Sequence, residues 1–307
     1  MLPIKVETEN RQSHRRISAV RLRELVHRIG GAGDRFLIVE GIPARPGVFV
    51  QVWHEQGGEY ELQHRTGSGV RHMFSTRLTD PDRVADAMAR WARRDTAWDA
   101  GIDWEVDDLG PAAEVEPLEP RVRERAEEHV RRMLRHGYLG LAELADETVY
   151  LMDDPGAEPG PVSKPQAREI VERLWLERLD EQDGWTGETD PDRLERAFAE
   201  LTASGITARE DFTCCHGCGT AEIGAERADG ERGFVFFHHQ GTESAAEGHG
   251  LALYYGEFEE AGTTTTAEVG HEVVAALTRA GLTAEWDGSP ERAIELGGLD
   301  WRKRLTG

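Results

Sequence analysis

Hydrophobic and polar residues alternate with two different periods over the first third of the chain. Tyr60, Leu62 and His64 alternate with polar residues, which is the two-residue period of a strand with one face toward solvent. Between Val84 and Trp91 the apolar residues recur at helical spacing, as on a helix that packs against a sheet. Residues 1–106 are therefore predicted to form an α+β module with an N-terminal helix and an antiparallel sheet. The expected elements are a helix over 17–29, strands over 36–40, 48–55, 59–65 and 72–77, a helix around 84–91, and a short strand over 102–106.

The last two thirds of the chain show helical spacing first and an alternation of strands and helices afterwards. Apolar stripes predict helices around residues 122–134, 167–175 and 194–201. The elements expected after them are a strand over 207–213, a helix over 215–226, strands over 233–238 and 251–255, a helix over 268–280, and strands over 283–286 and 293–296. The order βαββαβ is typical of a ferredoxin-like sandwich. Residues 121–307 are thus predicted to be a helical lead-in followed by an α/β domain, and the whole chain is expected to be α+β.

A change in composition separates the two parts. Residues 107–120 (DDLGPAAEVEPLEP) are rich in proline and acidic residues and hold few large apolar side chains. Such a segment cannot bury enough apolar surface to pack as an element of its own. We therefore predict an acidic, proline-rich linker over 107–120 between the two domains.

Net charge and hydropathy exclude some classes of partner and indicate where the protein is found. The 307 residues include 36 Lys and Arg against 58 Asp and Glu, which gives a net charge of −22. A surface of this sign disfavours phosphate backbones, so nucleic acid is not an expected partner. The apolar runs are far shorter than the roughly 20 residues that a membrane span needs, and Met1–Lys5 opens no signal-peptide pattern. We expect a cytoplasmic protein whose partner, if it has one, is another protein of basic character; the oligomeric state is left open.

All three cysteines fall in one short segment, Phe212–Gly219 (FTCCHGCG), where a strand should lead into a helix. Cys214 and Cys218 are four residues apart and can share one helix face, and the positive end of a helix dipole favours thiolates. The next predicted strand ends at His238, which a helix and a returning strand can bring beside the thiols. Because two or three sulfurs and an imidazole are a donor set typical of zinc, we predict Cys214, Cys215, Cys218 and His238 as metal ligands.

Two other interpretations of the cysteines stay open. They can be small buried apolar residues at a helix–sheet junction. They can also carry thiol chemistry, with Cys215 as the attacking thiolate, Cys218 as the resolving thiol, and His238 or His216 as the proton carrier. No spacing in the chain identifies a catalytic set, so the leading hypothesis is a binding or scaffolding protein with a structural zinc site. A thiol-dependent enzyme is the alternative.

Several short motifs of the second domain together resemble a bacterial family of domains of unknown function. They are Phe212-Thr213-Cys214-Cys215 with Cys218-Gly219, Val235-Phe236-Phe237-His238, Thr242-Glu243, Tyr255-Gly256, Trp286-Asp287-Gly288 and Asp300-Trp301-Arg302. The resemblance covers the second domain and leaves the first outside. It implies a shared fold and a shared site that joins Cys214, Cys215, Cys218 and His238, and it implies no particular activity.

Overall fold

The structure is a computed structural model that describes residues 1–153, 160–258 and 264–306. The chain divides into two compact units by its internal contacts. The first unit comprises residues 1–130, 139–177 and 305–307, and the second comprises 131–138 and 178–304. Both helices and antiparallel sheet are present, so the predicted α+β class is confirmed. No helix of the described residues combines the length and apolar character needed to cross a membrane.

A seven-stranded antiparallel sheet forms the body of the first unit, with the order β2-β1-β3-β4-β5-β6-β7. Its strands are β1 Ile4–Thr8, β2 Ser13–Arg15, β3 Phe36–Gly41, β4 Val48–His54, β5 Tyr60–Thr66, β6 His72–Leu78 and β7 Glu105–Asp108. Leu37 is paired with Val52, and Val52 with Leu62, so the three side chains share one face of the sheet, and all three are fully buried. The strands predicted from residue 36 onward are found close to their expected places.

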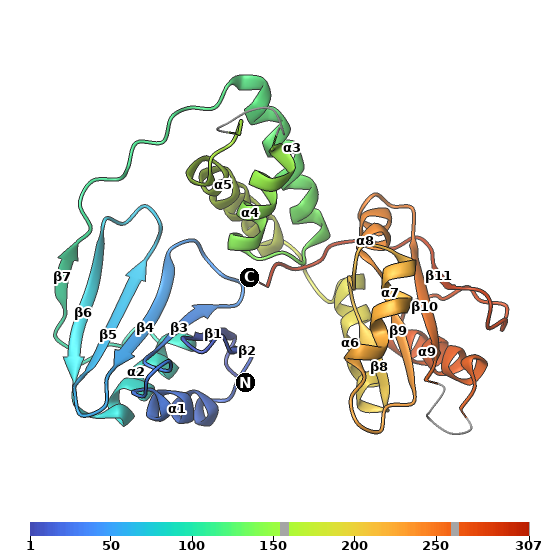
Figure 1. Ribbon diagram of the computed structural model, residues 1–307, viewed down its shortest axis with the longest axis horizontal. Helices are drawn as coiled ribbons and strands as arrows, with labels where there is room; N and C mark the ends of the chain where they lie inside the picture. The colour runs from blue at the N-terminus through green and yellow to red at the C-terminus, as the bar shows by residue number, and fades with distance from the viewer. Residues whose placement is uncertain (154–159, 259–263, 307) are drawn as a thin grey trace. The chain divides into compact units, whose positions relative to one another are not determined.

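Helices α1 (Ala19–Arg28) and α2 (Pro81–Ala92) lie against that face (Figure 1). Ser18 caps α1 by accepting a hydrogen bond from the backbone N–H of Arg21, and Asp80 caps α2 in the same way through Asp82. Val84 and Met88 of α2 are fully buried and belong to the same hydrophobic cluster as the inner face of the sheet. The stripe of apolar residues in α2 therefore packs as its spacing predicts.

Three helices follow the sheet in the sequence: α3 (Pro120–His136), α4 (Leu141–Met152) and α5 (Lys164–Asp183). They bury Val130, Leu144, Leu174 and Trp175, and the Trp175 indole donates a hydrogen bond of 2.8 Å to the carbonyl oxygen of Ala44. The division into two units passes through α3 and α5, so each of these helices contributes residues to both units. The predicted linker over 107–120 thus lies within the first unit, and its role as a separator of two folding domains stays a prediction.

The second unit contains a four-stranded sheet with the order β11-β10-β9-β8. Its strands are β8 Ile206–Arg209, β9 Gly233–Phe236, β10 Leu251–Glu257 and β11 Ile294–Leu296. Strands β8 and β9 are parallel, and the other neighbours are antiparallel. Three helices, α6 (Asp190–Ala203), α8 (His239–Ala246) and α9 (Thr266–Ala280), supply residues to one hydrophobic cluster with Val235 and Leu253 of the sheet.

Helix α7 (His216–Glu222), which continues as a 3₁₀ turn over Ile223–Glu226, lies on the other face of this sheet. Val235 and Phe236 are neighbours in β9 and point to opposite faces. Val235 joins the cluster of α6 and α9, whereas the Phe236 ring lies directly against Gly219 of α7. The short helix that carries the cysteines is therefore seated on an aromatic surface of β9.

The predicted order of elements in this unit was wrong in one respect. Helix α8 stands between β9 and β10, so the order is βαβαβαβ instead of βαββαβ, and the ferredoxin-like arrangement is not confirmed. The segment of α8 (HQGTESAA) holds small and polar residues without a broad apolar stripe, so its spacing gives a weak helical signal. The strand expected over 283–286 is reduced to a single bridge between Glu285 and Glu295.

Candidate metal centre

The cysteines follow the carboxyl end of β8, beside the carboxyl end of its parallel neighbour β9. The backbone N–H of Phe212 donates to the carbonyl of Phe237 at 2.8 Å, and that of His239 donates to Thr213 at 3.1 Å. These bonds extend the pairing of β8 and β9 past the strands. Because the carboxyl ends of parallel strands meet at one edge of a sheet, residues 211–215 and 237–239 are brought together there.

The backbone just before the cysteines adopts an uncommon conformation at two positions. Asp211 has φ of 50° and Thr213 has φ of 59°, in the left-handed region that side chains other than glycine rarely enter. Thr213 is β-branched, for which this region is especially unfavourable. Asp211 is held by two partners: its Oδ1 accepts from the Thr242 hydroxyl at 2.5 Å and lies 3.0 Å from Nδ1 of His239. The chain is thus bent sharply where it presents Cys214.

The three thiols form one compact group. The Sγ atom of Cys214 lies 3.7 Å from that of Cys215 and 3.4 Å from that of Cys218. All three sulfurs lie within 4.8 Å of one another, which is close enough to hold one metal ion. Cys214 is exposed and the other two are half-buried, so the group is open to solvent. The interpretation of the cysteines as buried apolar residues therefore does not describe this arrangement.

The thiols perturb one another. The backbone N–H of Cys218 lowers the pKa of the Cys215 thiol, since Cys215 is the N-cap residue of α7, and the Cys214 thiol adds to this effect. Hydrogen bonding to Cys214, and then to Cys215, raises the pKa of Cys218 to about 11. In the metal-free protein Cys215 is therefore ionised before Cys218, and binding of a metal would release the proton of Cys218.

His238 lies outside the group of three thiols, although it was predicted as a ligand with them. Its side chain caps α8: Nδ1 accepts a hydrogen bond of 3.1 Å from the backbone N–H of Gly241. A neutral imidazole that accepts at Nδ1 carries its proton at Nε2, which leaves no free lone pair for a metal. Burial lowers the pKa of His238, and the nearby His216 adds to this, so the ring stays neutral.

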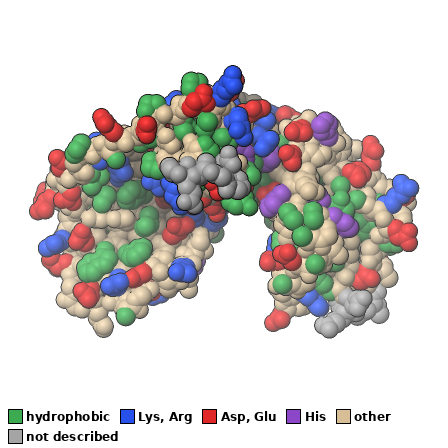
Figure 2. Space-filling view, turned by 45° about the horizontal axis from the view of Figure 1, so that its top comes forward, with side chains coloured by type: hydrophobic (Ala, Val, Ile, Leu, Met, Phe, Trp, Pro, Cys, Tyr) green, Lys and Arg blue, Asp and Glu red, His purple; other side chains and the backbone are tan. Residues whose placement is uncertain are grey.

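Aromatic rings surround the base of α7. The His216 ring stacks on Tyr254 with centroids 4.1 Å apart, and the His238 ring lies 5.4 Å from the same tyrosine. Tyr254 in turn packs against Phe236, with ring centroids 5.7 Å apart. Figure 2 shows several histidine side chains at the surface of this unit. The stacking of His216 on Tyr254 joins the start of α7 to β10, while His216 itself stays exposed to solvent beside the thiols.

Some residues that shape the site were missed by the sequence analysis. Asp211 orients the turn, and Tyr254 supports His216, but neither belongs to a recognisable ligand spacing. An acidic residue in the turn after a strand, three positions before the first cysteine of the cluster, is the signal that could have indicated Asp211. Nothing in the alternating pattern of β10 distinguishes Tyr254 from an ordinary strand residue.

Comparisons with known proteins place most of this chain in a family. The family model described as "Domain of unknown function (DUF6891)" matches residues 119–305. The chain belongs to this family. The DUF6891 match begins at the start of α3 and takes in the thiol cluster and the whole of the second sheet. Searches of the curated proteins and of the solved structures gave no significant match.

Proposed function

We propose that the DUF6891 part of this chain binds one zinc ion through Cys214, Cys215 and Cys218, within a protein that acts by binding or scaffolding. The observation that carries the proposal is the spacing of the sulfurs. A tetrahedral zinc site with Zn–S bonds of about 2.3 Å has S–S edges of about 3.8 Å. The Sγ–Sγ distances of 3.7 and 3.4 Å are close to this edge, so a metal fits with small rotations of the side chains.

The donor set favours zinc among the common metals. Thiolates are soft ligands that suit Zn²⁺, Cu(I) and iron–sulfur clusters, whereas Mg²⁺ and Ca²⁺ take oxygen. A cluster of the common iron–sulfur types takes four cysteines, and the chain holds three. A zinc ion held by three thiolates would fasten the start of α7 to the bent segment after β8. The metal would then stabilise a junction whose thiols are partly open to solvent.

The fourth coordination position of the zinc ion would then be taken by an exchangeable ligand such as water. His238 was the expected fourth ligand, but a metal-bound histidine ordinarily donates a hydrogen bond from its other ring nitrogen. Here that nitrogen accepts one from Gly241, so coordination by His238 would require the loss of the cap of α8. His238→Asn separates the two roles, because asparagine is a good N-cap residue and lacks an imidazole.

The experiment is metal analysis of the full chain, expressed in zinc-containing medium and purified without a metal-affinity step. We expect close to one zinc per chain in the wild type and a large loss in Cys214→Ser, Cys215→Ser and Cys218→Ser. The His238→Asn variant is expected to keep its zinc. Less than about half a zinc per chain in the wild type would end the proposal, because each folded chain with a structural zinc site should hold one zinc ion.

The alternative is a thiol-dependent enzyme, and the lowered pKa of Cys215 is the observation that favours it. In that case the Cys215 thiolate attacks a disulfide of a partner protein, which forms a mixed disulfide and releases one thiol of the partner. Cys218 then attacks the Cys215 sulfur, which releases the second thiol, so the partner disulfide is reduced as the Cys215–Cys218 disulfide forms. Rapid alkylation of Cys215 in protein as purified, lost after mild oxidation, would support this alternative. Zinc-bound thiolates would be protected from the reagent until a chelator is added, which separates the two functions.

A further inference from the structure

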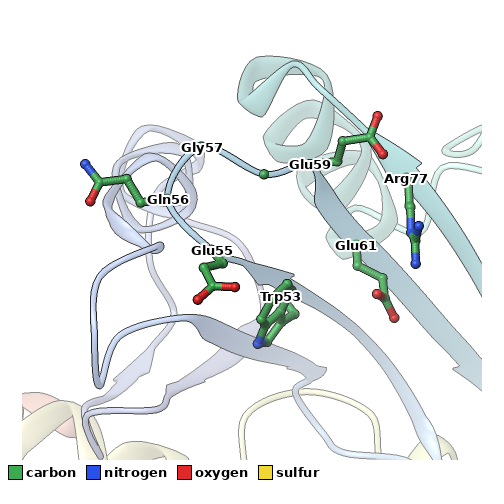
Figure 3. Close-up of a pocket in the computed structure, with 8 residues that line it drawn as sticks. Trp53, Glu55, Gln56, Gly57, Glu59, Glu61 and Arg77 are labelled. Atoms are coloured by element: carbon green, nitrogen blue, oxygen red, sulfur yellow. The ribbon is translucent and has the colours of Figure 1, made fainter.

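A second feature, in the first unit and far along the chain from the cysteines, has the character of a binding site. A cavity of about 450 Å³ lies at the hairpin that joins β4 to β5 and at the adjoining part of β6. Figure 3 shows the indole of Trp53 between the side chains of Glu55 and Glu61, with Arg77 beyond Glu61; Glu59 also lines the cavity. None of these residues takes part in the core of the unit.

Strand register places the side chains of the cavity in one row. Trp53 of β4 is paired with Glu61 of β5, and Glu61 is paired with Arg77 of β6. Side chains of directly paired residues stand about 5 Å apart on the same face of a sheet. The neighbours Val52 and Leu62 are fully buried on the opposite face, under α1 and α2. The row therefore lies on the outer face of the sheet.

Trp53 is unusual among the tryptophans of the protein. Its side chain is 40% exposed, whereas the other seven tryptophans are buried or half-buried. An indole is the best aromatic surface for a cation, since the face of its π-system carries negative potential. An exposed tryptophan in a hollow is also the kind of residue that provides most of the binding energy in protein interfaces.

The charges that line the cavity are mainly negative, with the carboxylates of Glu55, Glu59 and Glu61 against the one guanidinium of Arg77. In the described part of the chain, the carboxylates of Glu55 and Glu59 make no side-chain hydrogen bond or ion pair, and Glu61 accepts only from the Gln63 amide at 2.8 Å. The Arg35 guanidinium, which interacts electrostatically with Glu55, donates its hydrogen bonds to Glu9. A cation over the indole would thus meet Glu55 without displacing a side-chain partner, and would compete with the Gln63 amide for Glu61.

We propose that this cavity is a docking site for a basic segment of a partner protein, with one lysine or arginine side chain stacked on Trp53 between Glu55 and Glu61. A long cationic side chain fits because its stem can cover the indole while its charge meets the carboxylates. A peptide backbone can lie over the outer face beyond the cavity, where Gln51 and Gln63 offer polar groups and are joined by a hydrogen bond of 2.6 Å. The net charge of −22 steers such a partner toward the protein.

The probe is a fluorescein-labelled eight-residue peptide that alternates arginine with serine, and its binding to the full chain is followed by fluorescence anisotropy. A peptide in which glutamate replaces arginine is the reference. We expect Trp53→Ala and Glu61→Gln each to weaken binding of the basic peptide about fivefold. Both side chains lie on the outer face, and circular dichroism spectra confirm that each variant is folded.

Two matched variants of the same unit test whether the cavity itself is responsible. Tyr150→Ala removes an aromatic side chain that is 73% exposed on α4, and Glu169→Gln removes one exposed charge on α5. Both are expected to bind the basic peptide within about twofold of the wild type. Equal weakening by Glu61→Gln and Glu169→Gln would show a general attraction to an acidic protein and overturn the proposal. Displacement by free argininamide at the same concentration as unlabelled peptide would overturn the assignment to a protein segment.

Discussion

The seat of α7 on β9 can be tested with two glycines of the same short helix. A methyl group added at Gly219 would lie 2.6 Å from Cζ of the Phe236 ring and nearer still to a second ring carbon. Phe236 is fully buried and packs against Phe212 and Tyr254, so its ring has little room to move. At Gly217 the same methyl group would meet nothing within 4 Å. Gly219→Ala therefore introduces a clash that Gly217→Ala lacks.

The magnitude follows from two opposing effects. Replacing glycine by alanine within a helix favours folding by up to about 1 kcal/mol, and both variants share this gain. Extra atoms in a close-packed contact disfavour folding by roughly 1–3 kcal/mol, which applies to Gly219→Ala alone. We expect Gly219→Ala to be less stable than Gly217→Ala by about 1–3 kcal/mol, and to bind zinc more weakly because α7 must shift.

Urea unfolding of the metal-free protein, followed by NMR signals of β9, measures this difference in stability separately from the unfolding of the first unit. A shift of the midpoint to lower urea in Gly219→Ala, with Gly217→Ala at or above the wild type, is the expected outcome. Equal midpoints for the two variants would mean that Gly219 does not contact Phe236 as the structure has it, and the positioning of Cys215 and Cys218 would need another explanation.

Three further predictions concern the units themselves. Burial lowers the pKa of His64 from 6.5 to about 4, so as the pH falls its imidazole is protonated in the unfolded chain before it is protonated in the folded one. The free energy of unfolding of the first unit should therefore be highest above about pH 6.5 and fall by up to about 3 kcal/mol toward pH 4. His64→Phe should flatten this part of a plot of the urea midpoint against pH. The buried hydroxyl of Tyr138 donates to Glu210 at 2.7 Å, so Tyr138→Phe should lower the free energy of unfolding of the second unit by about 1–3 kcal/mol in urea titrations, and no change would contradict a bonded hydroxyl. Arg94 follows α2 with φ of 57°, so Arg94→Gly should raise the melting temperature through a gain of roughly 0.5–1 kcal/mol, whereas a loss would argue against the left-handed conformation.

The sheet of the first unit could be predicted largely because its signals are local. The apolar residues of strands β3 to β6 and of helix α2 are regularly spaced, and glycines or an Asp-Pro cap mark where these elements begin or end. Strand β1 was missed, although Ile4, Val6 and Thr8 are buried in alternation, since five residues before a long polar segment give a short pattern. Helix α4 was missed as well, because its cap is formed by Gly140 and Glu143, which is not a common starting signal.

The candidate site, too, could be predicted only in part from the sequence. The proximity of the three thiols follows from their spacing at a helix start, and this part was predictable. The neighbourhood of His238 was also predictable, since β8 and β9 end at one edge. Its role was not, because the bond from Gly241 to Nδ1 depends on a helix whose start the sequence does not mark. Likewise, the exposure of Trp53 depends on which face of the sheet the helices cover.

X-ray absorption at the zinc edge tests whether the three sulfurs of Cys214, Cys215 and Cys218 hold one metal ion. For the full chain loaded with one equivalent of zinc, we expect three sulfur scatterers at about 2.3 Å and one nitrogen or oxygen at about 2.0 Å. The same spectrum is expected for His238→Asn. A first shell made only of nitrogen and oxygen would show that the three thiols do not bind the metal.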